Sequence, residues 1–328
     1  MVQLDRLKFV SPLDGSVNDF NPEWFKCEQN HFGEEENWIL NSRYFDEIPF
    51  KLFIRLNFPR NELTIESSSK ILRDNYPAGI TGSTFQYVLT ELSYYVRLDN
   101  EFILNNSEVV SCDIKKDIPI ELDQRSIRTI PLLLKPSSKF DCNKFSNGVS
   151  IKKRNSTINR NFNLKFYNKG KEIRMSKNDS FVNFVDHPYS IYQAFSGITR
   201  VELELKSKHL IRTFFNTQNL SIDSILNSPV DPMAKGIHSF FEPEPLPVTS
   251  TFECNSIGEY KNYLLVEKCD FDIEKVEKLL REKMSWKTNL RSAIKPYKKI
   301  ILAGYSIESL VDDKITQLVN KLKYEHVL

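Results

Sequence analysis

Residues 162–173 read Phe-Asn-Leu-Lys-Phe-Tyr-Asn-Lys-Gly-Lys-Glu-Ile, and their apolar and polar side chains alternate. Successive side chains of a β-strand point to opposite faces of its sheet. Leu164 and Phe166 therefore fall on one face, which is expected to be buried. The opposite face presents a phenol between two ammonium groups, from Lys165, Tyr167 and Lys169.

Other segments alternate in the same way and are predicted to be strands of one antiparallel sheet. They cover residues 2–10, 50–58, 62–66, 108–120, 148–153 and 197–206. Apolar residues at helical spacing predict helices from Ser83 or Thr84 to about Val96, and over 272–284 and 311–322. We therefore expect an α+β fold with a central antiparallel sheet, helices packed on one face, and a smaller, mainly helical C-terminal region.

The predicted domain boundaries follow the composition along the chain. Residues 1–215 hold the strands and are expected to form the main domain. Residues 216–255 contain a proline-rich stretch at 226–250, which predicts a linker or extended segment. Residues 256–328 are expected to form the helical C-terminal region. No internal repeat is visible in the sequence.

The overall composition indicates a folded protein outside the membrane. Of its 328 residues, 40% are hydrophobic and 27% charged, which is enough to bury a substantial core. The longest apolar run is far too short to span a bilayer, and no N-terminal targeting signal is visible. Scattered cysteines without a C-x-x-C pair favour reduced thiols over a disulfide framework or a zinc cluster. We expect a cytoplasmic location and no membrane partner.

Positive charge is concentrated in two tracts. Residues 151–177 carry nine Lys or Arg and one acid, and residues 275–299 carry nine and two acids. Their net charges of +8 and +7 leave −13 for the rest of a chain whose overall charge is +2. Such segregation is typical of a protein that binds a polyanion, although each tract alone could be an ordinary solvated face.

Three of the predicted strands each have one face rich in ionisable groups. If they are neighbours in the sheet, their carboxylates converge near the hydroxyl of Tyr167. Carboxylate oxygens suit Mg²⁺ or Mn²⁺, and the five histidines contain no H-x-H pair that would offer an alternative. The candidate metal ligands are Asp113, Asp117, Glu202 and Glu204.

A phenol beside a metal site and ammonium groups could attack a DNA phosphodiester, because the cations would favour both the phenolate and the approaching phosphate. The structural alternative is that Tyr167 packs across strands and that the charged residues form cross-strand ion pairs. The sequence pattern leaves both interpretations open.

Taken in order, several segments resemble the gene II protein family of filamentous phages and related phage and plasmid rolling-circle replication initiators. They are Leu4-Asp-Arg-Leu-Lys-Phe9, Ser67-Ser-Ser-Lys-Ile-Leu-Arg-Asp-Asn75, Val109-Val-Ser-Cys-Asp113, Tyr167-Asn-Lys-Gly-Lys-Glu-Ile173, Arg200-Val-Glu202 with Leu210, and Tyr297-Lys-Lys-Ile-Ile-Leu-Ala-Gly-Tyr305. The likeness departs where the family has an arginine two positions before the aspartate, because Ser111 stands there. The literal R-x-D at Arg97–Asp99 directly follows a predicted helix, so Asp113 is preferred.

The resemblance implies that residues 1–215 form a catalytic nicking and joining domain. Tyr167 would attack an origin phosphodiester, form a 5′-phosphotyrosyl link, free a 3′-hydroxyl primer and later rejoin the displaced strand. Lys169 would contact a phosphate or the transition state, and Asp113 and Glu202 would hold Mg²⁺ or Mn²⁺. The implied partners are phage or plasmid origin DNA and the helicase, polymerase and single-strand-binding protein of a bacterial host cell, in whose cytoplasm the protein would act. The expected DNA-binding residues are Lys152, Lys153, Arg154, Arg160, Lys165, Lys171 and Arg200.

Two other functions fit the same residues. The protein could be a non-catalytic initiator that binds and melts origin DNA, with Tyr167 structural. Alternatively, it could be an RNA-binding or nuclease-like protein that uses water as the nucleophile. The three hypotheses predict different effects of removing the Tyr167 hydroxyl.

Overall fold

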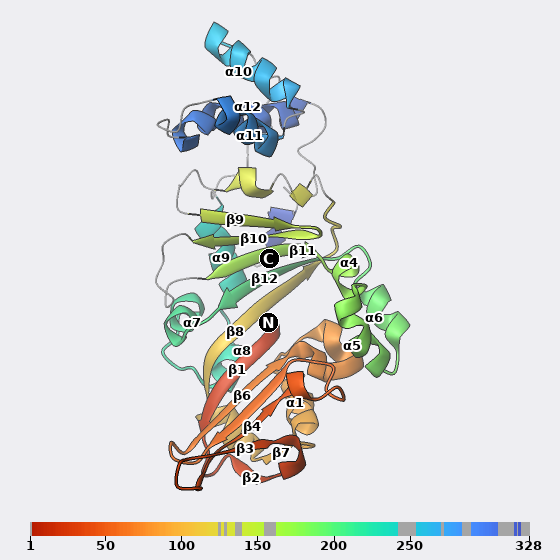
Figure 1. The fold of residues 1–328 in the computed structure, drawn as a ribbon, viewed down its shortest axis with the longest axis vertical. Coiled ribbons are helices and arrows are strands. Elements are labelled where there is room, and N and C mark those ends of the chain that lie inside the picture. The colour runs from red at the N-terminus through yellow and green to blue at the C-terminus, as the bar shows by residue number, and fades with distance from the viewer. Residues whose placement is uncertain are drawn as a thin grey trace.

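A computed structural model describes residues 2–123, 126–127, 130–134, 140–153, 162–241, 254–269, 272–283, 290–307, 318–319 and 321–322. Its centre is a ten-stranded antiparallel sheet with the order β3-β4-β5-β6-β1-β8-β12-β11-β10-β9 (Figure 1). The strands are β1 (Leu4–Pro12), β3 (Lys26–Gln29), β4 (Glu35–Asn41), β5 (Leu52–Asn57), β6 (Glu62–Ser68), β8 (Glu108–Ile118), β9 (Phe140–Phe145), β10 (Gly148–Lys153), β11 (Asn163–Asn168) and β12 (Thr199–Leu205). A small second sheet pairs β2 (Val17–Phe20) with β7 (Val96–Leu98). The predicted α+β class and central antiparallel sheet are confirmed.

The two halves of the large sheet share one strand order, although the sequence shows no repeat. Each half starts at a central strand, β1 or β8, and next to it lies the last strand of that half, β6 or β12. The remaining strands then follow outward in reverse chain order. Because β1 and β8 pair at the centre, side chains from both halves meet on the faces of these two strands.

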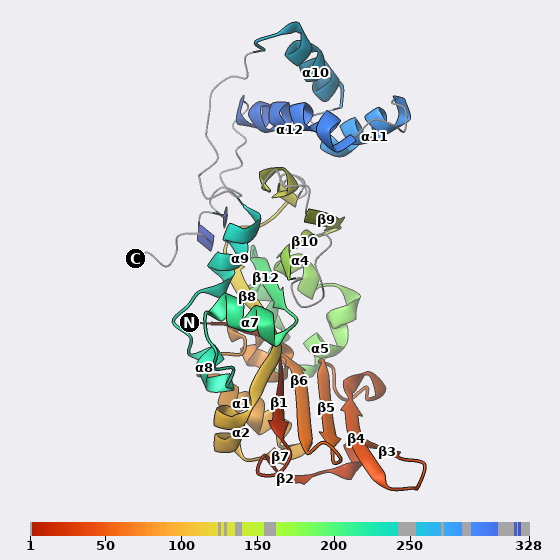
Figure 2. The ribbon, with the colours of Figure 1, turned by 90° about the vertical axis from the view of Figure 1, so that its left-hand side faces the viewer.

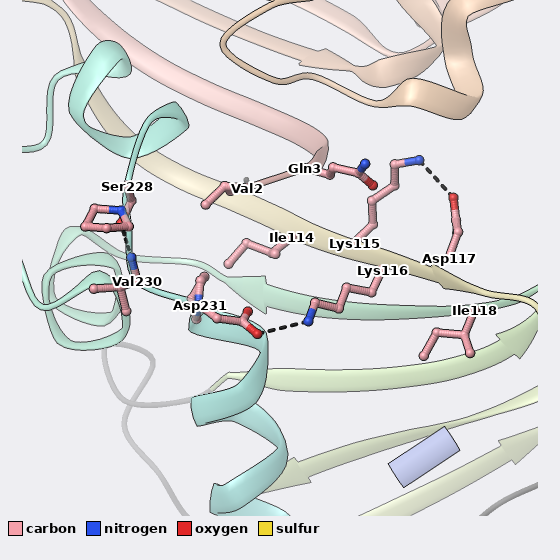
Figure 3. A pocket seen from close by; sticks show the side chains of 12 residues that line it. Val2, Gln3, Ile114, Lys115, Lys116, Asp117, Ile118, Ser228, Val230 and Asp231 are labelled. Carbon is pink, nitrogen blue, oxygen red and sulfur yellow. Dashed lines mark hydrogen bonds and ion pairs between the residues drawn. The ribbon is translucent and has the colours of Figure 1, made fainter. Parts of the chain in front are cut away.

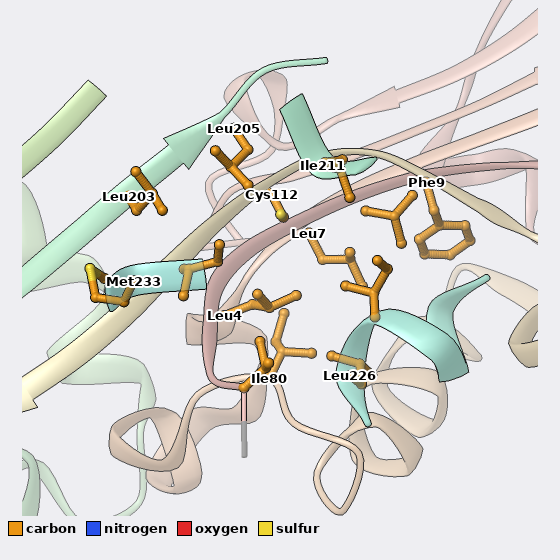
Figure 4. Close-up of a cluster of buried hydrophobic side chains, with 14 of the residues drawn as sticks. Leu4, Leu7, Phe9, Ile80, Cys112, Leu203, Leu205, Ile211, Leu226 and Met233 are labelled. Atoms are coloured by element: carbon orange, nitrogen blue, oxygen red, sulfur yellow. The ribbon is translucent and has the colours of Figure 1, made fainter. Parts of the chain in front are cut away.

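Helices cover the apolar face of the central strands. Alternation places residues such as Leu7, Cys112 and Leu203 on this face, where they are fully buried (Figure 4). They pack in one core with α2 (Asn100–Asn106), α7 (Lys208–Phe215), α8 (Ile222–Leu226) and α9 (Pro232–Phe240), while α1 (Phe85–Leu92) joins the same core. Figure 2 shows α7 and α8 on one side of the strands and α5 on the other.

A second group of short helices covers one end of the polar face. It comprises η3 (Ser69–Ala78), α4 (Lys169–Ile173), α5 (Asp179–Phe184) and α6 (Pro188–Ala194). Their apolar side chains, among them Phe181 and Phe195, pack around Tyr76. The Tyr76 hydroxyl in turn accepts a hydrogen bond from Arg200 on β12. This cover buries charged groups that would otherwise lie on an open sheet face.

The expectation of a linker or extended segment starting at residue 216 is wrong for residues 216–241. This part of the chain forms α8 and α9, whose Ile222, Met233 and Phe240 are fully buried in the sheet's core. Pro232 is the first residue of α9, behind the N-cap Asp231, a position where proline favours a helix rather than interrupting one. Residues 242–253 of the predicted segment lie outside the described residues.

The helical C-terminal region is confirmed. It contains α10 (Ile257–Lys268), α11 (Ile273–Lys283) and α12 (Leu290–Ile307), which share a core of their own. The predicted helix over 311–322 lies mostly outside the described residues, but Leu318, Val319 and Leu322 pack into the main core. Within the ranges given above, no helix is both long and apolar enough to cross a membrane.

Gly79→Ala is expected to destabilise the protein strongly. Gly79 ends η3 with a φ of +70°, and a Cβ there would lie 2.5 Å from Cε of the buried Lys115. Strain and overpacking together should lower the free energy of unfolding by roughly 2–4 kcal/mol, measured by urea denaturation. Gly33→Ala is the matched control, because its φ is +83° but nothing lies within 4 Å of the added Cβ. Equal losses in the two variants would show that the contact with Lys115 is unimportant.

Candidate active site on the polar face of the sheet

Tyr167 lies on β11, between β10 and β12, with its side chain on the polar face. The strand register places Tyr167 opposite Arg200, and Lys165 opposite Glu202. The Tyr167 hydroxyl donates a hydrogen bond to Oε1 of Glu202. Only 8% of the tyrosine is exposed. The predicted neighbourhood of Tyr167 and Glu202 is therefore present, and the hydroxyl is bonded directly to the carboxylate.

The expectation that lysines favour the phenolate is wrong in this arrangement. Burial and the nearby Glu202 carboxylate raise the pKa of Tyr167 well above its ordinary value. Lys165 instead pairs with Glu202 and Glu204. The Lys169 ammonium is 2.6 Å from Glu172 and lies 5.7 Å from the centre of the Tyr167 ring. A phenol in this setting needs a base to take its proton.

Arg200 is fully buried and holds two carboxylates, so its predicted role as a DNA contact is wrong. Its Nε and Nη2 donate to the two oxygens of Asp117 at 2.6 and 2.7 Å, and its Nη1 donates to Asp5 at 2.6 Å. The guanidinium contributes to holding the pKa of Asp117 at about 2, well below its ordinary value. Arg200 therefore positions its neighbours rather than meeting a ligand.

Asp5 belongs to this network because β1 is irregular at that point. The pairing of β1 with β8 shifts between Leu4 and Arg6, so that Asp5 and Arg6 both reach the polar side. Asp5 also accepts a hydrogen bond from Ser69 of η3 at 2.9 Å. The sequence pattern assigns Asp5 no role, because a bulge cannot be seen in a local alternation of side chains.

Arg6 supplies the arginine that the chain lacks next to Asp113. Its Nε and Nη2 donate to the two oxygens of Asp113 at 2.8 Å each, and Nη2 also donates to Ser111 at 2.9 Å. The guanidinium comes from the neighbouring strand, across the β1–β8 pair. Arg6 belongs to the predicted first strand, yet the register that brings it to Asp113 could not be predicted.

A groove of about 710 Å³ runs over the central strands beside this network. Lys165, Glu202 and Glu204 form part of its wall. Its charges are balanced, with five carboxylates and five cations, namely Asp5, Glu66, Asp113, Glu202 and Glu204 against Arg6, Lys8, Lys51, Lys165 and Lys206. A strand of nucleic acid lying in this groove would compete with these carboxylates for the cations.

The carboxylates as arranged do not fit Mg²⁺ or Mn²⁺. Arg6 binds both oxygens of Asp113, and the Lys165 ammonium lies between Glu202 and Glu204. Asp117 is held apart by Arg200 and Lys115. Across the described ranges, no three potential metal-ligating side chains gather closely enough to bind a cation. The metal site stays a prediction, and occupying it would require Lys165 to move.

The other predicted DNA-binding residues are spread around the site. Lys152 is half-buried on β10, Lys153 ends that strand, and Lys171 is exposed on α4, whereas Arg154 and Arg160 lie outside the described residues. Lys169 is only 2% exposed and is surrounded by the rings of Tyr76, Tyr167 and Phe195. The expected contact of Lys169 with a phosphate is therefore wrong for this arrangement.

A smaller cavity of about 280 Å³ lies between β8 and the connection from α8 to α9 (Figure 3). Ile114, Ile118 and Val2 line it, together with an ion pair of 2.9 Å between Lys116 and Asp231. Lys115 and Asp117, which alternate with Ile114, Lys116 and Ile118 along β8, line it as well, so the cavity is in contact with both faces of this strand. It shares Lys115 and Asp117 with the buried network around Arg200 but has no lining residue in common with the groove.

Comparison with known protein families, with curated proteins and with solved structures found no match to this chain.

Glu202 should make the stability of the fold depend on pH. Burial and the charge of Asp5 raise its pKa from 4.5 to about 7. A carboxyl group with a raised folded-state pKa stabilises the fold below its unfolded pKa, and that contribution is lost as the pH rises through the folded value. Between about pH 4.5 and 7, the unfolding free energy of the wild type should fall by roughly 3 kcal/mol more than that of Glu202→Gln. Parallel pH profiles from urea denaturation would contradict this assignment, because all other groups are shared.

Proposed function

We propose that this protein is a rolling-circle replication initiator that nicks and rejoins an origin strand with Tyr167 as the nucleophile. The observation that carries the proposal is the convergence of the motif segments. Asp5, Ser69, Asp113, Tyr167 with Lys169, and Arg200 with Glu202 come from distant parts of the chain, and they line one groove or join the buried network beside it. The resemblance rests only on the order and spacing of the motifs in the sequence, so it did not require that these residues come together in the fold.

The proposed reaction is a transesterification in which Glu202 acts as the base. The Tyr167 oxygen attacks the phosphorus, its proton passes to Oε1 of Glu202, and a phosphotyrosyl bond forms as the bond to the 3′-oxygen breaks. The leaving oxygen takes a proton from solvent and becomes the 3′-hydroxyl that primes synthesis. A carboxylate with a pKa of about 7 is well suited to accept a proton near neutral pH. Reversal rejoins the strand without ATP.

The proposed reaction requires a local opening, because the phenol lies behind Glu202 at the wall of the groove. A single strand in the groove would bring a phosphodiester to this wall, with Lys165 available to its non-bridging oxygens once it leaves Glu202 and Glu204. No step is assigned to a metal ion. In this proposal residues 2–241 form the nicking unit, and host helicase, polymerase and single-strand-binding protein act after the nick.

A non-catalytic origin-binding initiator is the second candidate. The burial of Tyr167 and its raised pKa favour this alternative, since both suit a structural tyrosine. In that case Tyr167 and Glu202 would only stabilise the pairing of β11 with β12. Origin binding would then occur without any break in the DNA.

The deciding experiment uses supercoiled DNA that carries the origin of the genetic element encoding this protein. The wild type is incubated with this DNA in Mg²⁺, in Mn²⁺ and in EDTA, and the products are separated on denaturing gels. We expect nicked DNA and a protein band shifted by attached DNA. Tight binding with no nick and no shifted band in any buffer would favour the non-catalytic candidate. Nicking without a covalent band would point to water as the nucleophile.

A further inference from the structure

Lys70 lies next to the proposed active site with its positive charge incompletely balanced. It is half-buried on η3, its ammonium donates to Oδ1 of Asn178 at 2.7 Å, and it lies 4.9 Å from the centre of the Phe181 ring. Among the side chains that the structure describes, no carboxylate oxygen is within ion-pair distance of it. An ammonium can donate three hydrogen bonds, so two of its donors remain available to a ligand.

Two further lysines share the same surroundings. Glu172 accepts from Lys169 at 2.6 Å through one oxygen and pairs with Lys177 at 2.8 Å through the other. Asn178, the partner of Lys70, donates to the backbone oxygen of Glu172 at 2.6 Å. Lys169 and Lys177 thus bind one carboxylate, and Lys70 is linked to the same residue through Asn178, so the four charged groups sum to +2, in contrast to the balanced groove.

These ammonium groups are close enough for their charges to repel one another. Burial and the charge of Lys169 lower the pKa of Lys70 to about 8, with a smaller contribution from Lys177, against the pull of the Glu172 and Asp5 carboxylates. Lys177 is 59% exposed, so this cluster opens to solvent on one side. An anion bound between Lys70 and Lys177 would relieve the repulsion and use the two remaining donors of Lys70.

We propose that Lys70 and Lys177 form a phosphate-binding subsite for the DNA strand, adjacent to the phosphodiester attacked by Tyr167. This inference rests on the proposed function and adds two residues to its DNA contacts. Lys169 connects the two places, because its ammonium binds Glu172 and also lies beside the Tyr167 ring. Asn178 and Glu172 position the lysines, and the phosphate oxygens are the ligand. A DNA strand bound both at this subsite and in the groove would run past Tyr167, which lies between the two.

The test measures binding of a fluorescent single-stranded oligonucleotide with the origin sequence over a range of salt concentrations. Lys70→Gln can keep the hydrogen bond to Asn178 but lacks the charge. We expect affinity to fall about 3–10-fold and the salt slope to become shallower by roughly 0.7, as expected for one lost phosphate contact. The double variant with Lys177→Gln should lose about 10–100-fold, and Lys70→Arg should restore most of the affinity.

Lys208→Gln is the control, because Lys208 is a partly exposed lysine of α7, on the other side of the sheet, that pairs with Glu108. Wild-type affinity and salt slope in Lys70→Gln and in the double variant would overturn the subsite, as would an equal loss in Lys208→Gln. The outcome is separable from the proposed function. A wild type that binds DNA without forming an adduct refutes nicking, while the salt slopes still report on the subsite.

Discussion

Tyr167→Phe is expected to eliminate the covalent protein–DNA adduct and to lower nicking by more than about 10³-fold, because it removes the attacking oxygen. The phenylalanine ring keeps the packing between β10 and β12. Losing the hydrogen bond to the buried Glu202 should cost about 1–3 kcal/mol of stability. DNA affinity should stay within about twofold of the wild type, since neutral phenol and phenyl rings carry the same charge.

Tyr192→Phe is the matched control for this result. Tyr192 is a half-buried tyrosine of α6 whose ring packs against Arg174 and which is not part of the groove. Nicking and adduct formation should be normal in this variant. A Tyr167→Phe protein that still cleaves, without forming an adduct, would identify a water nucleophile and leave Tyr167 a structural role.

Arg200→Met is expected to have the largest effect on stability. Methionine fills much of the same volume but leaves the carboxylates of Asp5 and Asp117 without their common partner in a buried setting. Removing one member of such a buried ion network should lower the free energy of unfolding by about 3–5 kcal/mol, measured by urea denaturation. Adding Asp117→Asn to Arg200→Met should recover part of this loss, because it removes one of the unpaired charges.

Arg55→Met gives the comparison at a partly exposed site. Arg55 pairs with Glu62 at 2.8 Å, and both side chains are about one third exposed. Loss of such a pair should change stability by about 0–1 kcal/mol. Similar losses for Arg55→Met and Arg200→Met would mean that the buried network contributes no more than a surface ion pair.

Seven strands were predictable because alternation is a local property, whereas β2, β3, β4, β7 and β9 were not expected from the sequence. Residues 163–168 and 199–205 were both expected as strands with one ionisable face, and they are neighbours in the sheet. This is why Tyr167 and Glu202 were placed together from the sequence. Helices α8 and α9 were missed because Pro229 and Pro232 among polar residues suggested a linker, whereas the tertiary core buries the apolar faces of both helices.

The electrostatics of the site could not be predicted from residue types. Lys165 and Lys169 flank Tyr167 along the chain, but their charges are directed to Glu202, Glu204 and Glu172. Similarly, the contact of Arg6 with Asp113 depends on the pairing of β1 with β8, and these two residues are 107 positions apart in the chain. Burial then decides the pKa of the phenol, and burial is set by η3 and the helices that come after β11.

The most direct measurement is to locate the DNA attachment on the protein by mass spectrometry. The wild type is reacted with origin DNA, the DNA is digested with nuclease, and the protein is cleaved with trypsin. Trypsin cuts after Lys165 and Lys169, so the peptide Phe166-Tyr167-Asn168-Lys169 should carry the nucleotide. Finding the nucleotide on Tyr167 is the predicted result, and finding it on any other residue would contradict the assignment of the nucleophile.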